Sequence, residues 1–366
     1  MDDKIRFKRK FKEEEANRFI REEGTKIDPA IWIPKLNEAR EVLERNKISY
    51  AFFGAPAVAA HNVLIRPTKD VDLVVKENKN DVAELLQNEL RLLHGHKLEP
   101  DDDAELVIDL QSKVFYEIWE NKLYTIIMTE EAWKRVQPTT MGYAISREDL
   151  IASKVGRYLQ SSLRKDTDLN DIAATLLSSR ELDYSYLTKR LIEGERREQM
   201  VTGTVWNLSW YFIRELPQYY KELVKLTQNE QKAREKLTEF ASNIISRLTT
   251  KEVEHQILKY CEKLTPTIPE LQKEFFLNNE TVKILTRKWE EDGMIELKGD
   301  RVKVNKNKMN EYFKKDAGEP TGFAKDRLIK NLKAGYRNPG TLASLSGCSK
   351  PYVYQIAKKM GIKLKE

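Results

Sequence analysis

Two aspartates separated by one residue, Asp70 and Asp72, have the side-chain type and spacing best suited to chemistry in this sequence. They accompany the apolar run from Val71 to Val75, which is typical of a β-strand. Side chains at positions i and i+2 of a strand share one face, about 6 to 7 Å apart. Paired carboxylates suit Mg²⁺ or Mn²⁺, which take carboxylate and phosphate oxygens as ligands. The pattern therefore predicts a divalent-metal site.

A glycine upstream extends this prediction to phosphate. Gly54 stands between an apolar, β-like segment at residues 48–53 and a segment of small residues at 55–62 that is compatible with a helix. Free N–H groups and the helix dipole at the start of a helix bind anions. Pro56 has no N–H and removes one such donor. We expect Gly54 and Ala55 to contact a nucleoside triphosphate that shares the metal.

Alternating strands and helices must position these groups. Strands are expected at residues 48–53, 71–75, 106–110 and 123–128, and helices at 34–46, 55–62 and 81–93, from their β-branched composition or their helical apolar periodicity. From residue 147 to about 248 the sequence reads as helices only. The expected fold is an α/β domain followed by an all-α region, a winged helix and a helix-turn-helix, in a multidomain chain.

The α/β stretch resembles the DNA polymerase beta-like nucleotidyltransferase superfamily, specifically its minimal AbiEii/MNT-type toxins. In that group a strand leads to a G-G-x-A turn, a histidine and then R-x-T-x-D-x-D. A third strand carboxylate follows, and then E-D-L-I-x-x-K and D-L-x-D-I. The matching residues, within roughly residues 30–180, are Gly54, Ala57, His61, Arg66, Thr68, Asp70, Asp72, Asp109, Glu148, Asp149, Leu150, Ile151, Lys154, Asp168, Leu169, Asp171 and Ile172.

The resemblance implies a metal-dependent nucleotidyltransferase that moves NMP from an NTP to an RNA or protein hydroxyl, with an antitoxin protein as partner. By this resemblance Asp70, Asp72 and Asp109 are catalytic and bind Mg²⁺ or Mn²⁺. The nucleotide-binding residues it implies are Gly54, Ala55, Arg66, Thr68 and Lys154.

Two alternatives stay open at this point. Ala55 replaces the second glycine or serine of the family, and this weakens the phosphate cradle. The alternative is a DNA-binding regulator or replication-associated protein with a catalytically degenerate nucleotidyltransferase domain. Lys154 lies on an otherwise apolar helix and is equally explained as a side chain that extends to solvent.

The C-terminal third contains two patterns typical of DNA-binding modules. Residues 251–313 read as three helices and a hairpin, a winged helix, and residues 323–366 as a helix-turn-helix. The second helix of such a motif enters the major groove, so its exposed residues would contact duplex DNA. The candidates on these helices are Thr281, Lys283, Arg287, Lys288, Lys350, Tyr352, Tyr354, Gln355 and Lys358, and those on the hairpin, the wing, are Lys298 and Arg301.

The charge distribution agrees with a nucleic-acid partner. Residues 301–366 carry 16 Lys and Arg against 5 Asp and Glu, whereas the whole chain has a net charge of +6. A basic end on a mildly acidic body favours polyanion binding, although a solvated lysine-rich surface has the same composition.

Length and composition set the remaining expectations. A chain of 366 residues suggests two or three domains. We place a charged N-terminal helix at 1–27, the nucleotidyltransferase-like domain at 28–146, a helical domain at 147–250, and the two DNA-binding modules at 251–313 and 323–366. The sequence lacks an apolar run of about 20 residues, so no membrane contact is expected. Two distant cysteines favour a reducing, cytoplasmic location.

Overall fold

The structure is a computed structural model. It describes residues 26–61, 63–68, 70–96, 104–124, 126–160, 165–179, 181–202, 208–248, 251–316, 328–329, 331–332, 337–339, 342 and 350–364. The chain divides into two compact units, residues 1–190 and 191–366, which are described separately. The N-terminal helix expected at 1–27 lies outside the described residues, apart from its last two positions.

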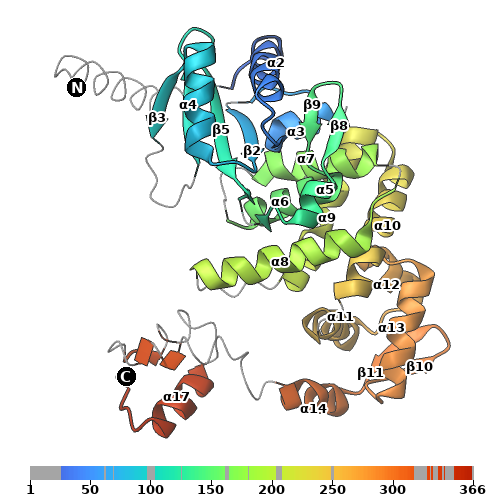
Figure 1. Cartoon of the computed structure of the whole chain (residues 1–366). Helices are drawn as coiled ribbons and strands as arrows, with labels where there is room; N and C mark the ends of the chain where they lie inside the picture. Colours follow the sequence, from blue (N-terminus) through green and yellow to red (C-terminus); the bar gives the residue numbers. More distant parts are fainter. Residues whose placement is uncertain are drawn as a thin grey trace. The chain divides into compact units, whose positions relative to one another are not determined.

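A seven-stranded mixed sheet forms the centre of the first unit (Figure 1). Its strand order is β3-β4-β5-β2-β1-β9-β8. The strands are β1 Tyr50–Phe52, β2 Asp70–Val75, β3 Leu93–His96, β4 Glu105–Asp109, β5 Val114–Glu120, β8 Gln137–Thr139 and β9 Gly142–Ala144. The pairs β2–β5 and β1–β9 are parallel, and the other pairs are antiparallel.

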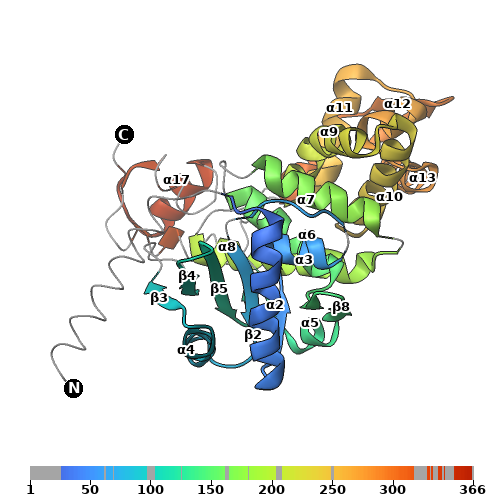
Figure 2. The same ribbon diagram turned by 90° about the horizontal axis from the view of Figure 1, so that it is seen from above.

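One face of the sheet is closed by two helices, α2 Pro29–Arg45 and α4 Lys79–Leu90 (Figures 1 and 2). Asp28 caps α2 by accepting a hydrogen bond from the N–H of Ala30. The buried stripe of α2 includes Trp32, Leu36 and Leu43. Each such side chain contributes roughly 1.5–3 kcal/mol on burial. This apolar layer holds the inward residues of β2, β4 and β5 in a fixed register.

The helices α3 Gly54–Ala60, α6 Arg147–Gln160 and α7 Lys165–Ser178 contact one another, and α3 also contacts β2 and β9. His61, at the C-terminal cap of α3, places Nε2 2.7 Å from the carbonyl oxygen of Ile145. Burial lowers the pKa of this histidine, so the neutral ring serves packing. α5 Glu130–Lys134 and α8 Tyr184–Thr202 complete the helices described up to residue 202.

The strand expected at residues 123–128 is wrong. The structure has two short antiparallel strands there, β6 Lys122–Leu123 and β7 Ile126–Ile127. Tyr124 lies in the turn between them with a left-handed backbone, φ +51°. An apolar run with β-branched residues looks like one strand in sequence, but here it folds back on itself.

In the second unit, α9 Leu208–Thr227 and α10 Glu230–Leu248 are followed by α11 Lys251–Leu264, α12 Ile268–Phe275 and α13 Asn279–Glu291. The hairpin of β10 Ile295–Lys298 and β11 Arg301–Val304 comes next, and then α14 Lys306–Asp316. This is the order of three helices and a hairpin that the sequence predicts. Thr267 caps α12 with a capping box that includes Glu270, as its position before Pro269 indicates.

The last described segment contains α17 Lys350–Lys359. A small apolar cluster joins this helix to residues before it, with Leu328, Leu332, Leu342, Val353 and Ile356 buried. Val353 and Ile356 thus form part of a small core in this segment. Among the helices that the structure describes, none has the length and apolar character needed to cross a membrane.

Candidate metal centre and nucleotide pocket

Three carboxylates meet on the sheet face opposite α2 and α4. Asp70 and Asp72 come from β2, and Glu117 comes from β5, where it pairs directly with Asp72 across the parallel ladder. One oxygen from each residue lies within 4.8 Å of the other two. An all-oxygen donor set of this kind fits Mg²⁺ or Mn²⁺. The strand alternation predicted for Asp70 and Asp72 thus produces the expected pair, with a third ligand from a neighbouring strand.

Asp109 does not join this group, and the expectation that it converges with Asp70 and Asp72 is corrected. In the β4–β5 ladder Leu106 pairs with Glu117, so Asp109, three residues further, projects from the other face. There its Oδ2 lies 3.0 Å from Lys35 Nζ on α2, and its Oδ1 accepts from the N–H groups of Gln111 and Ser112. Asp109 therefore closes a turn and anchors a helix.

The sequence patterns did not predict a role for Glu117, because the strand that carries it was not expected. The segment VFYEIWE, residues 114–120, has the aromatic and β-branched composition of a strand, and its one interior charge is Glu117. Burial of a glutamate within an apolar strand costs free energy unless its carboxylate has a hydrogen-bond, ion-pair or metal partner. That signal was available in the sequence, but the pairing of β5 with β2 was not.

Gly54 has a steric role beside Asp72. Its φ is +61°, and a Cβ atom built there would lie 1.8 Å from Asp72 Oδ2. Only glycine combines this backbone conformation with such a close approach. The other DxD carboxylate is held locally, because Thr68 Oγ1 donates to Asp70 Oδ1 at 3.1 Å. The motif residues Gly54 and Thr68 thus shape the carboxylate pair directly.

The electrostatic surroundings of Asp72 favour binding of a cation. Burial and the neighbouring Asp70 raise its pKa to about 7, although Arg157 and Lys154 oppose the shift. A divalent ion would remove this penalty by compensating the adjacent negative charges. The carboxylate set therefore fits the metal that the DxD pattern predicts.

Tyr124, which the sequence interpretation also missed, contacts the same carboxylate. Its hydroxyl donates to Asp72 Oδ1 at 2.9 Å and accepts from Arg157 Nη1 at 2.6 Å. Burial holds the pKa of Tyr124 well above its ordinary value, so the hydroxyl keeps its proton. The residue comes from the turn where a continuous strand was expected, so its position could not be inferred from that pattern.

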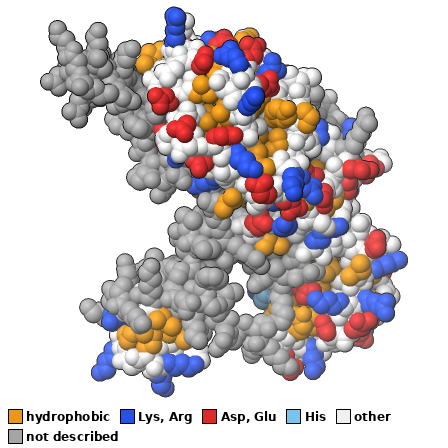
Figure 3. All heavy atoms as spheres, in the orientation of Figure 1, with side chains coloured by type: hydrophobic (Ala, Val, Ile, Leu, Met, Phe, Trp, Pro, Cys, Tyr) orange, Lys and Arg blue, Asp and Glu red, His pale blue; other side chains and the backbone are white. Residues whose placement is uncertain are grey.

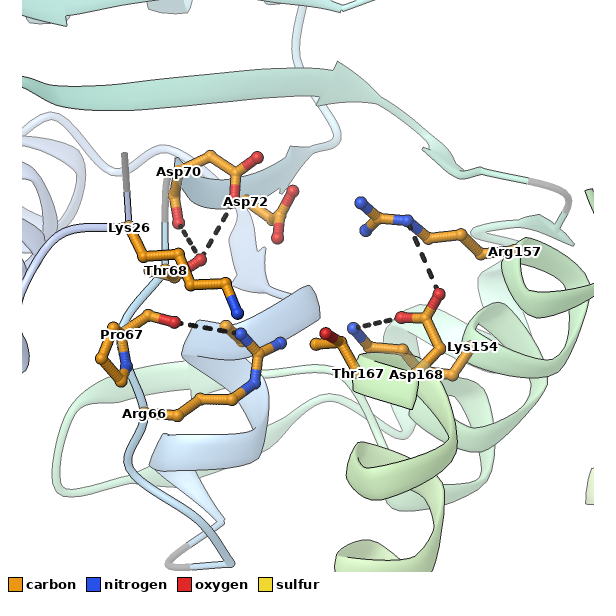
Figure 4. A pocket seen from close by; sticks show the side chains of 11 residues that line it. Lys26, Arg66, Pro67, Thr68, Asp70, Asp72, Lys154, Arg157, Thr167 and Asp168 are labelled. Carbon is orange, nitrogen blue, oxygen red and sulfur yellow. Dashed lines mark hydrogen bonds and ion pairs between the residues drawn. The ribbon is translucent and has the colours of Figure 1, made fainter. Parts of the chain in front are cut away.

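A pocket of about 390 Å³ opens beside Asp70 and Asp72 (Figure 4). Basic side chains and α7 form the wall across from the two aspartates, and Ala55 of α3 also lines it. The lining residues are Lys26, Ala55, Arg66, Pro67, Thr68, Asp70, Asp72, Lys154, Arg157, Thr167 and Asp168. Four of the predicted nucleotide-binding residues, Ala55, Arg66, Thr68 and Lys154, therefore line one pocket, and the fifth, Gly54, touches Asp72.

The cations of this wall are fixed by buried carboxylates. Arg66 makes a two-pronged contact with Asp171, at 2.9 and 2.7 Å. Lys154 Nζ lies 2.8 Å from Asp171 and 3.1 Å from Asp168. Lys154 is only 2% exposed, so the alternative in which it extends to solvent is wrong. Asp168 and Asp171 from α7 thus hold two basic groups at the pocket.

The predicted DNA-binding residues of α13 and the hairpin fall into two groups. Lys283, Arg287, Lys298 and Arg301 are exposed. Thr281 is only 6% exposed because it packs into the helical core, so its expected exposure is corrected. Lys288 is also exposed, and its ammonium group pairs with the buried Glu254.

On α17, Tyr354, Gln355 and Lys358 are exposed, as expected. The side chains of Lys350 and Tyr352 lie outside the described part of the chain. Figure 3 shows Lys and Arg beside apolar side chains on this described segment. Residues 328–364 contain seven Lys and Arg and no Asp or Glu, whereas residues 251–313 contain twelve of each sign. The positive charge therefore belongs to the last module.

No family model matches the sequence, and no curated protein matches it. The chain is similar to several solved structures at low identity. An antigenic nucleotidyltransferase-like protein from Paracoccidioides brasiliensis has 13% identity over 49% of this chain and 94% of its own, with a TM-score of 0.35. JHP933 from Helicobacter pylori has 14% identity, coverage of 62% and 93%, and a TM-score of 0.34. The Thermotoga maritima CCA-adding enzyme complexed with tRNA has 15% identity, coverage of 93% and 85%, and a TM-score of 0.25. Similarities this distant do not assign the chain to a family.

Proposed function

We propose that this protein is a metal-dependent nucleotidyltransferase that transfers NMP from an NTP to a hydroxyl group of RNA or protein. The observation that carries the proposal is the convergence of Asp70, Asp72 and Glu117 beside a pocket walled by basic side chains. Divalent ions bound by such carboxylates stabilise the charge that develops on a transferring phosphoryl group. The basic side chains of the pocket then serve to bind the triphosphate.

The charges in and around the pocket match a metal-bound triphosphate. Four cations, Lys26, Arg66, Lys154 and Arg157, line it. The five nearby carboxylates are Asp70, Asp72, Glu117, Asp168 and Asp171. Without metal the net charge of these nine side chains is slightly negative, which disfavours binding of the negatively charged NTP. With two divalent ions it becomes positive, which favours the roughly four negative charges of a triphosphate. Nucleotide binding should therefore require metal.

In this proposal Arg66, Lys154 and Arg157 bind the triphosphate and orient its α-phosphate. The acceptor hydroxyl forms a new P–O bond at the α-phosphate, the bond to the β-phosphate breaks, and pyrophosphate leaves. Glu117 takes the place that the resemblance gave to Asp109, as third carboxylate and as the group that accepts the hydroxyl proton.

The test is incubation of the full chain with labelled NTPs, Mg²⁺ or Mn²⁺, and total cellular RNA and protein. We expect label on one acceptor class, and loss of that label in an Asp70→Ala/Asp72→Ala variant. Asp109→Ala serves as a control that leaves the three carboxylates in place. Transfer by the double variant at the wild-type rate would refute the proposal.

The second candidate function is a nucleotide sensor with a degenerate site in a DNA-binding regulator or replication-associated protein. The observation that favours it is that the pocket is lined by Ala55, followed by Pro56, so a hydroxyl contact and one backbone donor are missing. Metal-dependent NTP binding without transfer to any acceptor would select this function over the first.

We also propose that the C-terminal modules bind duplex DNA, chiefly through residues 328–364. Seven positive charges without a negative one support this assignment, as do the exposed Tyr354, Gln355 and Lys358 on α17. The affinity should fall steeply with salt, since phosphate contacts release counterions. A Lys358→Glu/Lys359→Glu variant should bind more weakly, and Lys283→Glu/Arg287→Glu on α13 should change binding less. Salt-insensitive binding, or equal effects of the two pairs, would contradict it.

A further inference from the structure

Tyr124 stands between the carboxylate site and the basic wall of the pocket. Its ring contacts Phe53 and Trp119 edge-on, with centroids 5.3 and 5.4 Å away. The Arg157 guanidinium lies 4.5 Å from the centre of the same ring. Three planar groups thus hold the phenol, and its position is set by packing as well as by hydrogen bonds.

The hydrogen bonds at the phenol have a defined direction. A guanidinium can only donate, so the Tyr124 oxygen accepts from Arg157 Nη1. The one proton of the hydroxyl is then available for Asp72 Oδ1, which lies 2.9 Å away. Arg157 therefore orients the hydroxyl, and the hydroxyl orients the carboxylate.

The two oxygens of Asp72 are consequently not equivalent. Oδ1 is occupied by Tyr124, while Oδ2 faces Gly54, where a Cβ atom would lie 1.8 Å away. Rotation of the carboxylate would break the Tyr124 bond. The donor thus favours binding of one metal ion through one defined oxygen. Octahedral Mg²⁺ needs that precision more than Ca²⁺, which accepts irregular and two-oxygen carboxylate ligation.

Tyr124 has a left-handed backbone, with φ +51°. A left-handed backbone is unfavourable at a residue other than glycine and is retained where the surroundings require it. In the β6–β7 turn this conformation occurs together with the hydrogen bond between the phenol and Asp72.

We propose that Tyr124 is a positioning residue that fixes the orientation of Asp72 and so selects Mg²⁺ over larger divalent ions such as Ca²⁺. The inference rests on the proposed function, because it assumes that Asp70, Asp72 and Glu117 bind metal. It assigns the selectivity among ions to a side chain outside the carboxylate set.

The test is metal binding by the full chain without nucleotide, with Mn²⁺ followed by electron paramagnetic resonance and Mg²⁺ and Ca²⁺ measured as competitors. Tyr124→Phe removes only the hydroxyl. We expect it to weaken Mg²⁺ binding about 10-fold or more, the usual effect of losing a partner of a metal ligand. Ca²⁺ affinity should change less, so the Mg²⁺/Ca²⁺ ratio falls.

Tyr116→Phe is the matched control. Tyr116 is a buried tyrosine of the same sheet whose hydroxyl donates to the carbonyl oxygen of Lys35, on the face away from the carboxylates. This variant should leave the Mg²⁺/Ca²⁺ ratio unchanged even if its melting temperature falls. Should Tyr124→Phe not fold, Arg157→Lys, which keeps the charge and removes the Nη1 donor, is expected to lower the ratio in the same direction.

The outcomes separate the inference from the function on which it rests. Wild-type binding that is lost in Asp70→Ala/Asp72→Ala, together with an unchanged ratio in Tyr124→Phe, overturns the role of Tyr124 alone. A lowered ratio in Tyr116→Phe as well also overturns it, since the effect would then be general to the fold. Wild-type protein that binds no metal overturns both.

Discussion

On the sheet face covered by α2, Asp109 lies against Lys35 and accepts backbone hydrogen bonds from Gln111 and Ser112. Burial opposes its ionisation, but these contacts hold its pKa below the ordinary value. On the opposite face Asp72 is buried beside Asp70, and its pKa is raised to about 7. Two aspartates of one sheet are thus in opposite electrostatic states.

The difference indicates what each carboxylate contributes. Asp109 has partners for its charge within the chain and stabilises the fold as an anion. Asp72 has a hydroxyl donor and distant cations but also an anionic neighbour, so its ionised form is costly until a cation arrives. A buried carboxylate with its partners complete is structural, whereas one whose ionisation is opposed by burial and by a neighbouring carboxylate is a candidate cation site.

The largest difference between the two faces is expected when a methyl group is added on the face that carries Asp70 and Asp72. Gly54→Ala should abolish transfer and metal binding and lower stability by about 3 kcal/mol or more, from overpacking against Asp72 and backbone strain. The measurements are urea unfolding and Mn²⁺ titration.

Gly299→Ala is the control for the Gly54 substitution. Gly299 also has a positive φ, +65°, but a Cβ atom added there would meet no other atom within 4 Å. It should therefore show the backbone strain alone, with metal binding intact. Equal losses in the two variants would contradict the steric role of Gly54.

Exchanging single carboxylates for amides sharpens the comparison. Glu117→Gln should reduce transfer at least ~100-fold, because metal stabilisation of the transition state is worth several kcal/mol and 1.36 kcal/mol is tenfold in rate. Asp109→Asn should keep the rate within about threefold of the wild type once the protein is folded, since Asp109 lies on the other face of the sheet, against Lys35. The readout is the initial rate of labelled NMP transfer. A reversed order would restore Asp109 as the third catalytic carboxylate.

The smallest expected effect is on the stability of the metal-free protein. The folded pKa of Asp72 lies above its unfolded value, so the contribution of this group is present below about pH 4 and is lost as the pH rises through about 7. Asp72→Asn should then raise stability at pH 8 by about 1–2 kcal/mol and change little at low pH.

Asp109 should show the opposite sign. Its pKa is lowered, so its contribution is present above the unfolded pKa and is lost on acidification through the folded pKa. Asp109→Asn should therefore lower the melting temperature at pH 8, where Asp72→Asn raises it. Melting temperatures that moved in the same direction would show that the two faces do not differ as described.

Local pattern was sufficient for part of the site. The i, i+2 spacing placed Asp70 and Asp72 on one face, and Gly54, the first residue of α3, leaves the space that Asp72 occupies. The alternation of side chains within a strand also shows why the prediction for Asp109 was wrong. Its face depends on the register of β4 against β5, which is a tertiary property.

The remaining parts depend on contacts between distant segments. Glu117 required the β2–β5 pairing, and Tyr124 required a turn in an apolar run that favours a strand. Local preference is overridden at sites where function needs a particular geometry. The predicted exposure of Thr281 was wrong for a different reason. The sequence pattern did not distinguish the face of α13 that packs inward from the face that is exposed.

The parallel neighbours Asp72 and Glu117 have a consequence for the newly made chain. Ribosomes add roughly 5–20 residues each second. A growing polypeptide that has exposed Asp70 and Asp72 must wait a few seconds before Glu117 emerges, and longer before Arg157 follows. Under the proposed function, the three carboxylates can share an ion only once β5 has paired with β2, and a fragment ending before β5 would keep Asp70 and Asp72 but lack Glu117.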